Sequence, residues 1–578
     1  MPEDIYAPLA EYVDVFRDRF KKVAEDTFAE LAAEANVDVE ANRETCSQIY
    51  ATEDSLSSVK SHIWWWTAWC VLLWACVVGG GIAAYVMGQE LEVSMLVLII
   101  VAIIILIAYL FMRVHPRLKE MKSERDELAA TIKQLRDEAW EQMSALNQLY
   151  DWDVFTRMMS KTVPRLEFDP YFTTQRLADL KMTYNWDESF NAGRSVIYSH
   201  SGLINGNPFV ICRTRKMEMG SKTYTGSKTI TWTERERGSD GKYHTVYRSE
   251  VLTASITAPY PEYYEKTRLI YGNTAAPDLT FHREQNGLAG KENTLSFKLK
   301  KRSLRKKARN LSDGDFAMMT NEDFEVAFNT SDRNNNQQFA LLFTPLAQES
   351  MMELLKDNTV GYGDDFEFNK NRMINVIIPD HLQQIDLDMN PDQYRNFDYD
   401  KAKDDFYTIN AGYFRAIYFS FAPLLCVPMY QQIRPLSDIY GKNMQSHSSF
   451  WEHEALANFW GEEHFRHPSC VTNCILKTKQ KSGAGDSSTI TVYAFGYRCV
   501  QRLSYVSKFG GDGRWHNVPV YWDEYLPVTG QGNIDIKEDN AAQDASATQR
   551  QRLNHINSIL GETNLDIYRR NIASKVAK

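Results

Sequence analysis

The sequence lacks the short motifs that mark the common catalytic folds. It contains no Walker A loop, no G-x-G-x-x-G, no H-E-x-x-H and no G-x-S-x-G. Asp386 to Asn390 begins like a calcium loop, but Pro391 and Phe397 stand where the turn glycine and the bidentate glutamate belong. We therefore predict no EF-hand, leave the catalytic residues unassigned and favour a role that is not enzymatic.

The opening segment also lacks the features of a cleavable signal peptide, because MPEDIYAPLAEYVDVF has neither a basic start nor an early apolar core. The net charge of −10 argues against a general nucleic-acid binder. The eight cysteines are scattered, and those outside the apolar segments should face a reducing cytoplasm. We therefore predict no disulfide bond.

Two long apolar segments, Ile63 to Met87 and Ser94 to Met112, dominate the first quarter of the chain. Crossing about 30 Å of hydrocarbon takes about 20 apolar residues, and both segments qualify. The break at Gly88–Val93 is too short for a domain, so we predict a transmembrane helical hairpin rather than a buried hairpin of a soluble core. The first segment opens with aromatic residues that suit a membrane–water interface: Trp64, Trp65, Trp66 and Trp69.

The flanks of this hairpin predict its orientation. Lysines and arginines lie on both sides of it, whereas the connecting loop has none. By the positive-inside rule both termini lie in the cytoplasm, so we predict a two-pass protein of the cell's inner (plasma) membrane. Neither apolar segment carries an ionisable group deep in the bilayer, which disfavours a transporter or channel.

The helices around the hairpin have apolar stripes. In residues 1–60 the stripe is Leu9, Val13, Phe16, Phe20, Val23, Phe28 and Leu31, which we expect to pack against another helix. In residues 113–150 heptad positions a and d are mostly apolar, as in a coiled coil: Leu118, Met121, Arg125, Leu128, Ile132, Leu135, Ala139, Gln142, Leu146 and Leu149. The partner of this stalk is either the same chain, which we favour, or a second protomer in a homo-oligomer.

The remaining chain predicts a β-rich body. Short runs of β-branched and aromatic residues alternate with turn residues from Arg194 to Lys300 and again from Cys470 to Val528. The pattern D-G-[KR]-[YW]-H-x-V occurs at 240–246 and 512–518, either by convergence on a hairpin turn or through a duplicated β module. Phe324–Phe328 predicts a strand, and the apolar stretch 411–429, with two prolines and an arginine, fits a core segment better than a third span.

Taken together, these features predict a membrane-anchored α+β protein with an N-terminal helical bundle or coiled coil, a two-helix transmembrane hairpin and a cytoplasmic body of antiparallel sheets. The predicted ranges are amphipathic helices at 1–60, the hairpin at 61–112, the stalk at 113–150, a linker with short helices at 151–190, α+β modules at 191–400 and 401–528, a flexible linker at 529–548 and a C-terminal helix at 549–578.

One cluster has residue types that bind metals: His453, His464, His467, Cys470 and Cys474. Imidazole and thiolate ligands together suit tetrahedral zinc. Against this, Cys470 and Cys474 flank the expected start of a strand, which would place their side chains about 13 Å apart. Ordinary core and surface roles are therefore favoured over a zinc site, and we predict no other cofactor.

A run of basic residues is the other candidate site: Lys298, Lys300, Lys301, Arg302, Arg305, Lys306, Lys307 and Arg309. Eight of the twelve residues from 298 to 309 are basic, which fits a solvated loop, a lysine-rich linker or a patch facing anionic lipid headgroups. No aromatic residue interleaves with the run, so RNA binding is disfavoured and no nucleic-acid partner is expected.

Three segments give the chain a resemblance to a family: the hairpin, Asn321–Phe328 followed by Phe339–Pro345, and Ser201–Phe209. Over about residues 60–360 it resembles uncharacterised bacterial two-pass membrane proteins with a large cytoplasmic α+β domain. The resemblance implies topology and architecture and no activity. The function that we expect is a membrane-anchored interaction or scaffold protein that binds the lipid bilayer and a protein partner. The alternatives are a metal-dependent hydrolase and an anionic-lipid sensor.

Overall fold

A computed structural model describes residues 5–87, 93–237, 239, 241–309, 316–432, 447–540 and 548–577. Residue contacts divide the chain into two compact units. The body unit comprises Met1–Ala24, Trp152–Asn390 and Asn410–Lys578, and the helical unit comprises Glu25–Asp151 and Pro391–Ile409. Both predicted modules, 191–400 and 401–528, contribute to the body unit.

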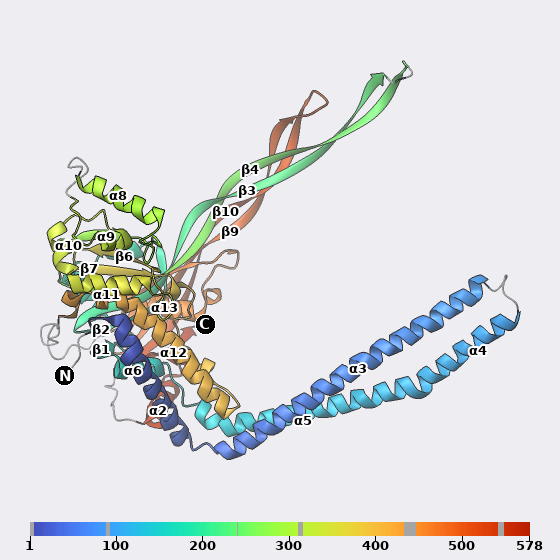
Figure 1. The fold of residues 1–578 in the computed structure, drawn as a ribbon, viewed down its shortest axis with the longest axis horizontal. Coiled ribbons are helices and arrows are strands. Elements are labelled where there is room, and N and C mark those ends of the chain that lie inside the picture. Colours follow the sequence, from blue (N-terminus) through green and yellow to red (C-terminus); the bar gives the residue numbers. More distant parts are fainter. Residues whose placement is uncertain are drawn as a thin grey trace. The chain divides into compact units, whose positions relative to one another are not determined.

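Three long helices make up most of the helical unit: α3 (Val39–Met87), α4 (Val93–Tyr109) and α5 (His115–Asn147) (Figure 1). Helices α3 and α5 run antiparallel, because Cys46 and Ile49 pack with Ala139 near one end of the pair and Cys70 packs with Leu118 further along. The prediction of N-terminal helices is therefore confirmed.

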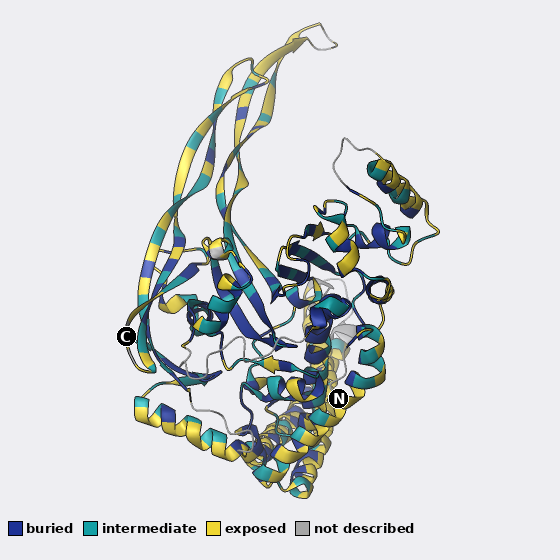
Figure 2. Cartoon of the chain, turned by 90° about the vertical axis from the view of Figure 1, so that its left-hand side faces the viewer, coloured by how far each residue is buried: buried dark blue, intermediate teal, exposed yellow. Residues whose placement is uncertain are grey.

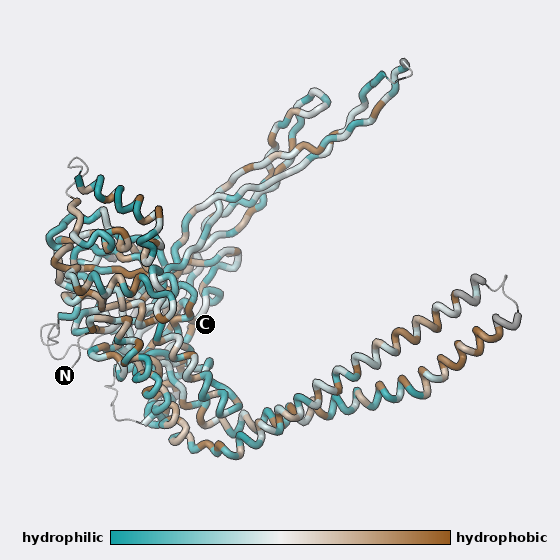
Figure 3. Tube along the Cα trace, viewed as in Figure 1, coloured by the Kyte–Doolittle hydropathy of each residue, from teal (hydrophilic) through white to brown (hydrophobic). Residues whose placement is uncertain are grey.

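Two helices among the described residues are long and apolar enough to cross a membrane, and only 11% of each apolar window is buried. Figure 3 shows hydrophobic residues following one another along α4 and the distal half of α3. The connecting segment 88–92 lies outside the described residues.

The predicted stripe on α5 faces its neighbour. From Leu118 to Gln142, every heptad a and d residue is buried or half-buried, whereas the residues between them are exposed. Hydrophobic contacts of this face are made with α3 of the same chain. That α5 forms a regular coiled coil stays a prediction, and so does its pairing with a second protomer.

The N-terminal stripe packs against a helix, as expected. Within the body unit, α1 (Pro8–Glu11), η1 (Tyr12–Phe16) and the start of α2 (Arg17–Ala35) contact α12 (Tyr399–Leu425). The Phe20 ring stacks on Phe414 with centroids 4.2 Å apart. Within the helical unit, Phe28 packs in the same way against Phe406 at 5.5 Å.

Antiparallel sheets form the body, as predicted. The order of the seven-stranded sheet is β1 (Leu166–Phe168), β2 (Arg194–Ile204), β3 (Asn207–Arg237), β4 (Tyr243–Gly272), β7 (Ile374–Pro379), β6 (Phe366–Asn371) and β5 (Thr280–Arg283). The order of the five-stranded sheet is β11 (Ile567–Arg569), β12 (Ile572–Ala577), β10 (Trp515–Glu538), β9 (Ser487–Phe509) and β8 (Ile475–Ala484).

Two hairpins extend beyond these sheets as long ribbons. The β3/β4 ribbon pairs from Phe209 with Tyr271 out to Arg237 with Tyr243, and the β9/β10 ribbon ends where Phe509 pairs with Trp515. At about 3.3 Å per residue, a strand as long as β3 spans roughly 100 Å. The residues of both ribbons are exposed or half-buried over most of their length (Figure 2).

The two ribbons lie side by side and share an apolar face (Figure 1). Ile230 and Leu252 of the β3/β4 ribbon pack with Val518 and Val520 of the β9/β10 ribbon. Gly226 permits close approach, since a Cβ atom there would lie 2.0 Å from the backbone oxygen of Pro519. This contact joins the two ribbons at a distance from their bases, and through the ribbons it joins the two sheets.

The repeated D-G-[KR]-[YW]-H-x-V pattern lies at the two ribbon tips. Gly241 and Gly513 both have a φ of +76°, a left-handed conformation that glycine adopts without strain. Tyr243 and Trp515, at matching positions of the pattern, are the first residues of β4 and β10. Both copies of the pattern therefore serve as hairpin turns, although Asp240 lies outside the described residues. That the two β modules arose by duplication stays a prediction.

The body unit also contains helices, including the part of α12 that begins at Asn410. They are α6 (Val154–Thr162), α7 (Thr174–Met182), α8 (Leu295–Arg309), α9 (Glu322–Phe328), α10 (Asn336–Leu342), α11 (Pro345–Lys356), α12, α13 (Phe450–Trp460) and α14 (Gln549–Thr563). Trp451 of α13 is fully buried, and its ring lies 5.8 Å from that of Phe172 and 5.3 Å from that of Trp186. Tyr171 and Phe172 are also buried, so the predicted linker 151–190 contributes to the core.

The predicted strand at Phe324–Phe328 is wrong. The segment forms helix α9, which begins at the N-cap Asn321, whose side chain accepts a hydrogen bond from the Phe324 N–H. Phe324 and Phe328 are four residues apart, so their rings stack on one helix face, 5.0 Å apart. Over so short a run, the alternating apolar residues of FEVAF fit a strand as well as they fit a helix.

Two predictions near the C-terminus also need correction. The range 529–548 was expected to be a linker, but β10 continues to Glu538, because Ile534 and Ile536 alternate into the core. Residues 541–547 lie outside the described residues. Helix α14 ends at Thr563, and the chain then returns to the sheet as β11 and β12, so 549–578 is only partly helical.

The apolar stretch 411–429 is a core segment, as expected. It forms most of the second half of α12 and leads into η7 (Pro428–Gln431). Its side chains from Phe414 to Val427 are largely buried. Arg415 donates to the backbone oxygens of Val360 at 2.7 Å and Gly361 at 3.0 Å.

We expect Trp451→Ala to lower the free energy of unfolding by about 3–5 kcal/mol, because it empties a fully buried site. The measurement is urea-induced unfolding of the detergent-solubilised protein followed by circular dichroism. Trp515→Ala is the control; this tryptophan is 71% exposed, so its removal should change stability by less than about 0.5 kcal/mol. Equal losses in the two variants would contradict the assigned core.

Candidate functional site

His453, the first residue of the predicted metal cluster, is a core residue. It lies on α13 and is buried, and its Nε2 lies 2.8 Å from the Ser448 Oγ. Burial lowers its pKa to about 4. A neutral, hydrogen-bonded imidazole inside the core is typical of a structural role.

The other two histidines lie at the surface. His464 ends η9 (Glu462–His464) and faces the Glu463 carboxylate at 4.0 Å. The His467 Nδ1 accepts a hydrogen bond from the Ser469 N–H at 3.1 Å. Throughout the described ranges, no group of three or more His, Cys, Asp or Glu side chains is placed to hold a metal ion. The zinc site stays a prediction without support from this arrangement.

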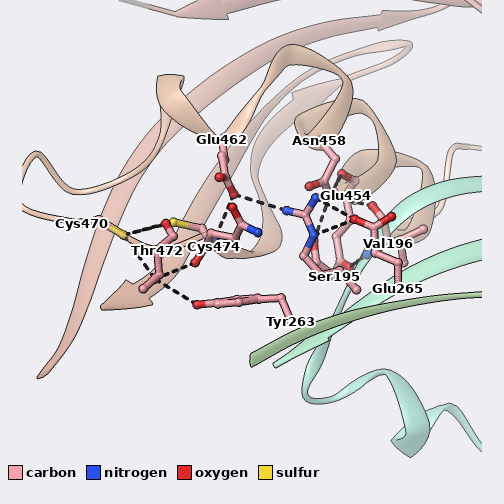
Figure 4. A network of polar contacts seen from close by, with 12 residues as sticks. Ser195, Val196, Tyr263, Glu265, Glu454, Asn458, Glu462, Cys470, Thr472 and Cys474 are labelled. Atoms are coloured by element: carbon pink, nitrogen blue, oxygen red, sulfur yellow. Dashed lines mark hydrogen bonds and ion pairs between the residues drawn. The ribbon is translucent and has the colours of Figure 1, made fainter. Parts of the chain in front are cut away.

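The expected separation of Cys470 and Cys474 is wrong. Their sulfur atoms lie 3.7 Å apart, because residues 470–474 form a turn that precedes β8 (Figure 4). Gly496 makes room for them, since a Cβ atom there would lie 2.5 Å from the Cys470 Sγ. Burial raises the pKa of the Cys474 thiol. The two thiols thus form a buried pair and not separate strand residues.

Polar contacts tie this turn to the base of the β3/β4 ribbon (Figure 4). The Glu462 carboxylate accepts a hydrogen bond from the Cys474 N–H at 2.7 Å and faces Arg215 of β3 at 3.4 Å. The hydroxyl groups of Thr472 and Tyr263 lie 3.1 Å apart, and burial raises the pKa of Tyr263 to about 12. The network joins the turn before β8, η9 and the base of the β3/β4 ribbon.

Glu454 belongs to a neighbouring set of contacts between α13 and β2. Burial raises its pKa to about 7, although Lys477 lies 3.0 Å from its carboxylate. The same carboxylate accepts a hydrogen bond from the Val196 N–H at 3.0 Å. A carboxyl that titrates near neutrality is a candidate general acid or base, but these partners indicate a structural role.

No pattern in the sequence indicates the buried ion network around Glu452. Its carboxylate lies 2.7 Å from Arg570 and 3.6 Å from Arg569, which also pairs with Asp388. The Arg570 guanidinium donates to the Ser199 backbone oxygen at 2.6 Å. An adjacent cavity of about 20 Å³ has room for about one water molecule. The network anchors the C-terminal strands to the core.

A groove of about 720 Å³ lies on the seven-stranded sheet beside residues 184–190. Its floor includes Ile270, Val376 and Asn369, which are in register across β4, β7 and β6. Arg268 lines the groove and donates to the Thr214 Oγ1 at 3.0 Å; burial lowers its pKa. The lining also includes Arg372, the Asp187 carboxylate and asparagine amides. A groove of this size with groups of both charges could hold a small polar ligand.

The predicted membrane-facing residues lie on two helices. Trp64, Trp65 and Trp69 on α3 are exposed, whereas Trp66 is half-buried and packs near Cys70. The basic run is neither loop nor linker, because it forms helix α8. No acidic residue interrupts this helix.

Comparison with known proteins gives no assignment. No protein-family model matches the chain, and no match was found among curated proteins or solved structures. The resemblance to two-pass bacterial proteins therefore stays a prediction.

We expect His453→Gln to remove part of the pH dependence of stability. The pKa is about 4 in the folded protein against an ordinary 6.5, so protons bind the unfolded chain more readily between these values. The stabilisation is present above about pH 6.5 and is lost as pH falls towards 4, by up to about 3 kcal/mol. The measurement is the free energy of unfolding at stepwise pH.

His464→Gln is the matched control, because this histidine is exposed. Comparing each variant with the wild type cancels the opposite trend expected from Glu454, whose raised pKa favours the folded state at low pH. Identical pH profiles for His453→Gln and the wild type would contradict the assigned burial.

Proposed function

We propose that the protein is a membrane-anchored scaffold that holds a binding body at the cytoplasmic face of a bacterial inner membrane. The observation that carries this proposal is the exposed apolar surface of α3 and α4. On α4, Leu98, Ile104 and Ile105 are all more than half exposed. Such a surface is unfavourable in water and favourable in hydrocarbon.

The ends of the apolar segments support the same placement. Trp64 and Trp65 are 64% and 66% exposed, and their rings pack edge to face with centroids 5.0 Å apart. Tryptophans of this kind are favoured at the membrane–water interface. Arg113 and Arg117 follow the second segment, so the positive-inside rule places both termini in the cytoplasm.

The ribbon tips supply the surface that we assign to a protein partner. Tyr243 and Trp515 at the tips are each 71% exposed, and Tyr247 and Tyr505 nearby are also exposed. Tyrosine and tryptophan are enriched in protein interfaces because a large rigid ring gives contact area at little entropic cost. A pair of ribbons stiffened by packing against each other presents these rings with little ordering needed on binding.

The hydrolase alternative receives no support from the described residues. Its ligands would be His453, His464, His467 and the two cysteines. His453 is buried on α13, and the other two histidines lie at the surface with partners of their own. We therefore retain the scaffold proposal.

The membrane topology can be tested by cysteine labelling of intact cells. Gln89→Cys reports on the segment between the two spans, and the native Cys499, exposed on β9, reports on the body. We replace the other exposed cysteine by Cys76→Ser. A membrane-impermeant maleimide should modify position 89 alone, and both positions once the cells are permeabilised. Modification of Cys499 in intact cells would refute the proposed topology.

The partner surface can be tested by co-purification from solubilised native membranes. The double variant Tyr243→Ser/Trp515→Ser should reduce recovery of a specific partner several-fold without changing stability, because both side chains are exposed. Tyr264→Ser is the matched control; this tyrosine is 51% exposed but lies near the ribbon base, opposite Lys216. Equal recovery with the tip variant and the wild type would argue against the tips as the binding surface.

A further inference from the structure

Helix α8 has one buried side and one exposed side. Phe297 and Leu304 are buried and pack with Phe316 and Val326 of the body. The first residue of the helix, Leu295, is 71% exposed, and Leu299, one turn later, is 53% exposed. A basic helix therefore stands at the surface of the body with two leucines turned outwards.

Three of the basic residues are held by the body. Lys301 lies 2.8 Å from the Asp323 carboxylate, and Lys307 donates to the Ser331 backbone oxygen at 2.8 Å. Arg305 donates to Glu322 at 2.8 Å, and this guanidinium holds the pKa of Glu322 at about 2. These contacts fix the helix to α9 and the loop that follows.

Of the five remaining basic residues, all but Lys300, which is half-buried, lie around the exposed leucines. Positions 295, 299, 302, 306 and 309 follow the spacing of a single helical face, which carries Leu295, Leu299, Arg302, Lys306 and Arg309. Lys298 borders the same face and is exposed. Across the described parts of the chain, none of Lys298, Arg302, Lys306 and Arg309 has an ion-pair partner.

We propose that this outward side of α8 binds an anionic lipid surface. The leucines would enter the boundary between headgroups and acyl chains, while the four cations face the headgroup phosphates and carboxylates. Each basic residue near such a surface strengthens binding about fivefold. The inference rests on the proposed membrane anchoring and deepens it: α8 would orient the body on the membrane, not recruit it.

The two exposed leucines favour lipid over other polyanions. An RNA strand or an acidic protein would also attract the four cations. RNA-binding surfaces, however, use aromatic side chains on which bases stack, and the outward side of α8 has none. Aliphatic side chains among cations are typical of helices that lie in a membrane interface.

The test uses the full chain in lipid nanodiscs. An environment-sensitive dye is attached at Ser303→Cys, beside the outward side of α8, in a Cys76→Ser/Cys499→Ser background. Co-elution with the disc reports anchoring, and the dye emission reports α8. We expect a blue shift in discs that contain phosphatidylserine and none in discs of phosphatidylcholine alone. The shift should disappear in about 1 M salt, where the Debye length is about 3 Å.

Two matched sets of substitutions separate lipid binding from structure. Lys298→Gln/Arg302→Gln/Lys306→Gln/Arg309→Gln should abolish the shift, because the outward cations are lost. Lys301→Gln/Arg305→Gln/Lys307→Gln, the inner-side variant, removes nearly as many charges, those that contact α9 and the loop that follows, and should retain the shift. Leu295→Ser/Leu299→Ser should reduce the shift by removing the inserted side chains. Thermal unfolding by circular dichroism checks that every variant is folded.

The outcomes are distinguishable. Co-elution without any lipid-dependent shift would overturn the role of α8 and leave the anchoring intact. Failure to co-elute with either disc would refute the anchoring and the inference that rests on it. A shift of the same size on adding single-stranded RNA to the detergent-solubilised protein would replace lipid by nucleic acid as the ligand. Loss of the shift in the inner-side variant, with that variant folded, would also overturn the assignment.

Discussion

The apolar contact between the two ribbons is the interaction on which the architecture of the body depends. A two-stranded ribbon is marginally stable alone, because it has no second layer to cover its apolar face. Here Ile230 and Leu252 meet Val518 and Val520, so each ribbon supplies the layer that the other needs. Because the strands continue into both sheets, the contact also joins the seven-stranded sheet to the five-stranded sheet.

Much of the fold could be predicted because it depends on local periodicity. The stripe through Phe16 and Phe20 and the heptads of α5 face partners as their spacing indicates. Where two periods fit equally well, the sequence cannot decide: in 324–328, phenylalanines four residues apart suit a helix face and a strand face alike. Strand β10 continues past Val528 because β9 and β12 flank it, which no local pattern reveals.

The candidate site was harder to predict, because sites depend on contacts distant in sequence. Glu452 and Arg570 are 118 residues apart, yet they form one buried ion pair. Cys470 and Cys474 were expected on a strand, whereas the chain turns between them and brings the sulfur atoms together. A short spacing fixes the distance between two side chains only when the backbone conformation is known.

The body separates charges that are buried and paired from charges that lie at its surface. Burying a charge is costly unless a partner compensates it, and the buried arginines are paired: Arg333 with Glu325 at 2.6 Å, Arg283 with Asp364 and Arg570 with Glu452. Inside the body these ions stabilise the fold. The outward cations of α8 and the aromatic rings of the ribbon tips lie at the surface, whereas Lys301, Arg305 and Lys307 hold α8 to the body. On the scaffold proposal, contact with lipid and with a protein partner would account for the exposure of these side chains.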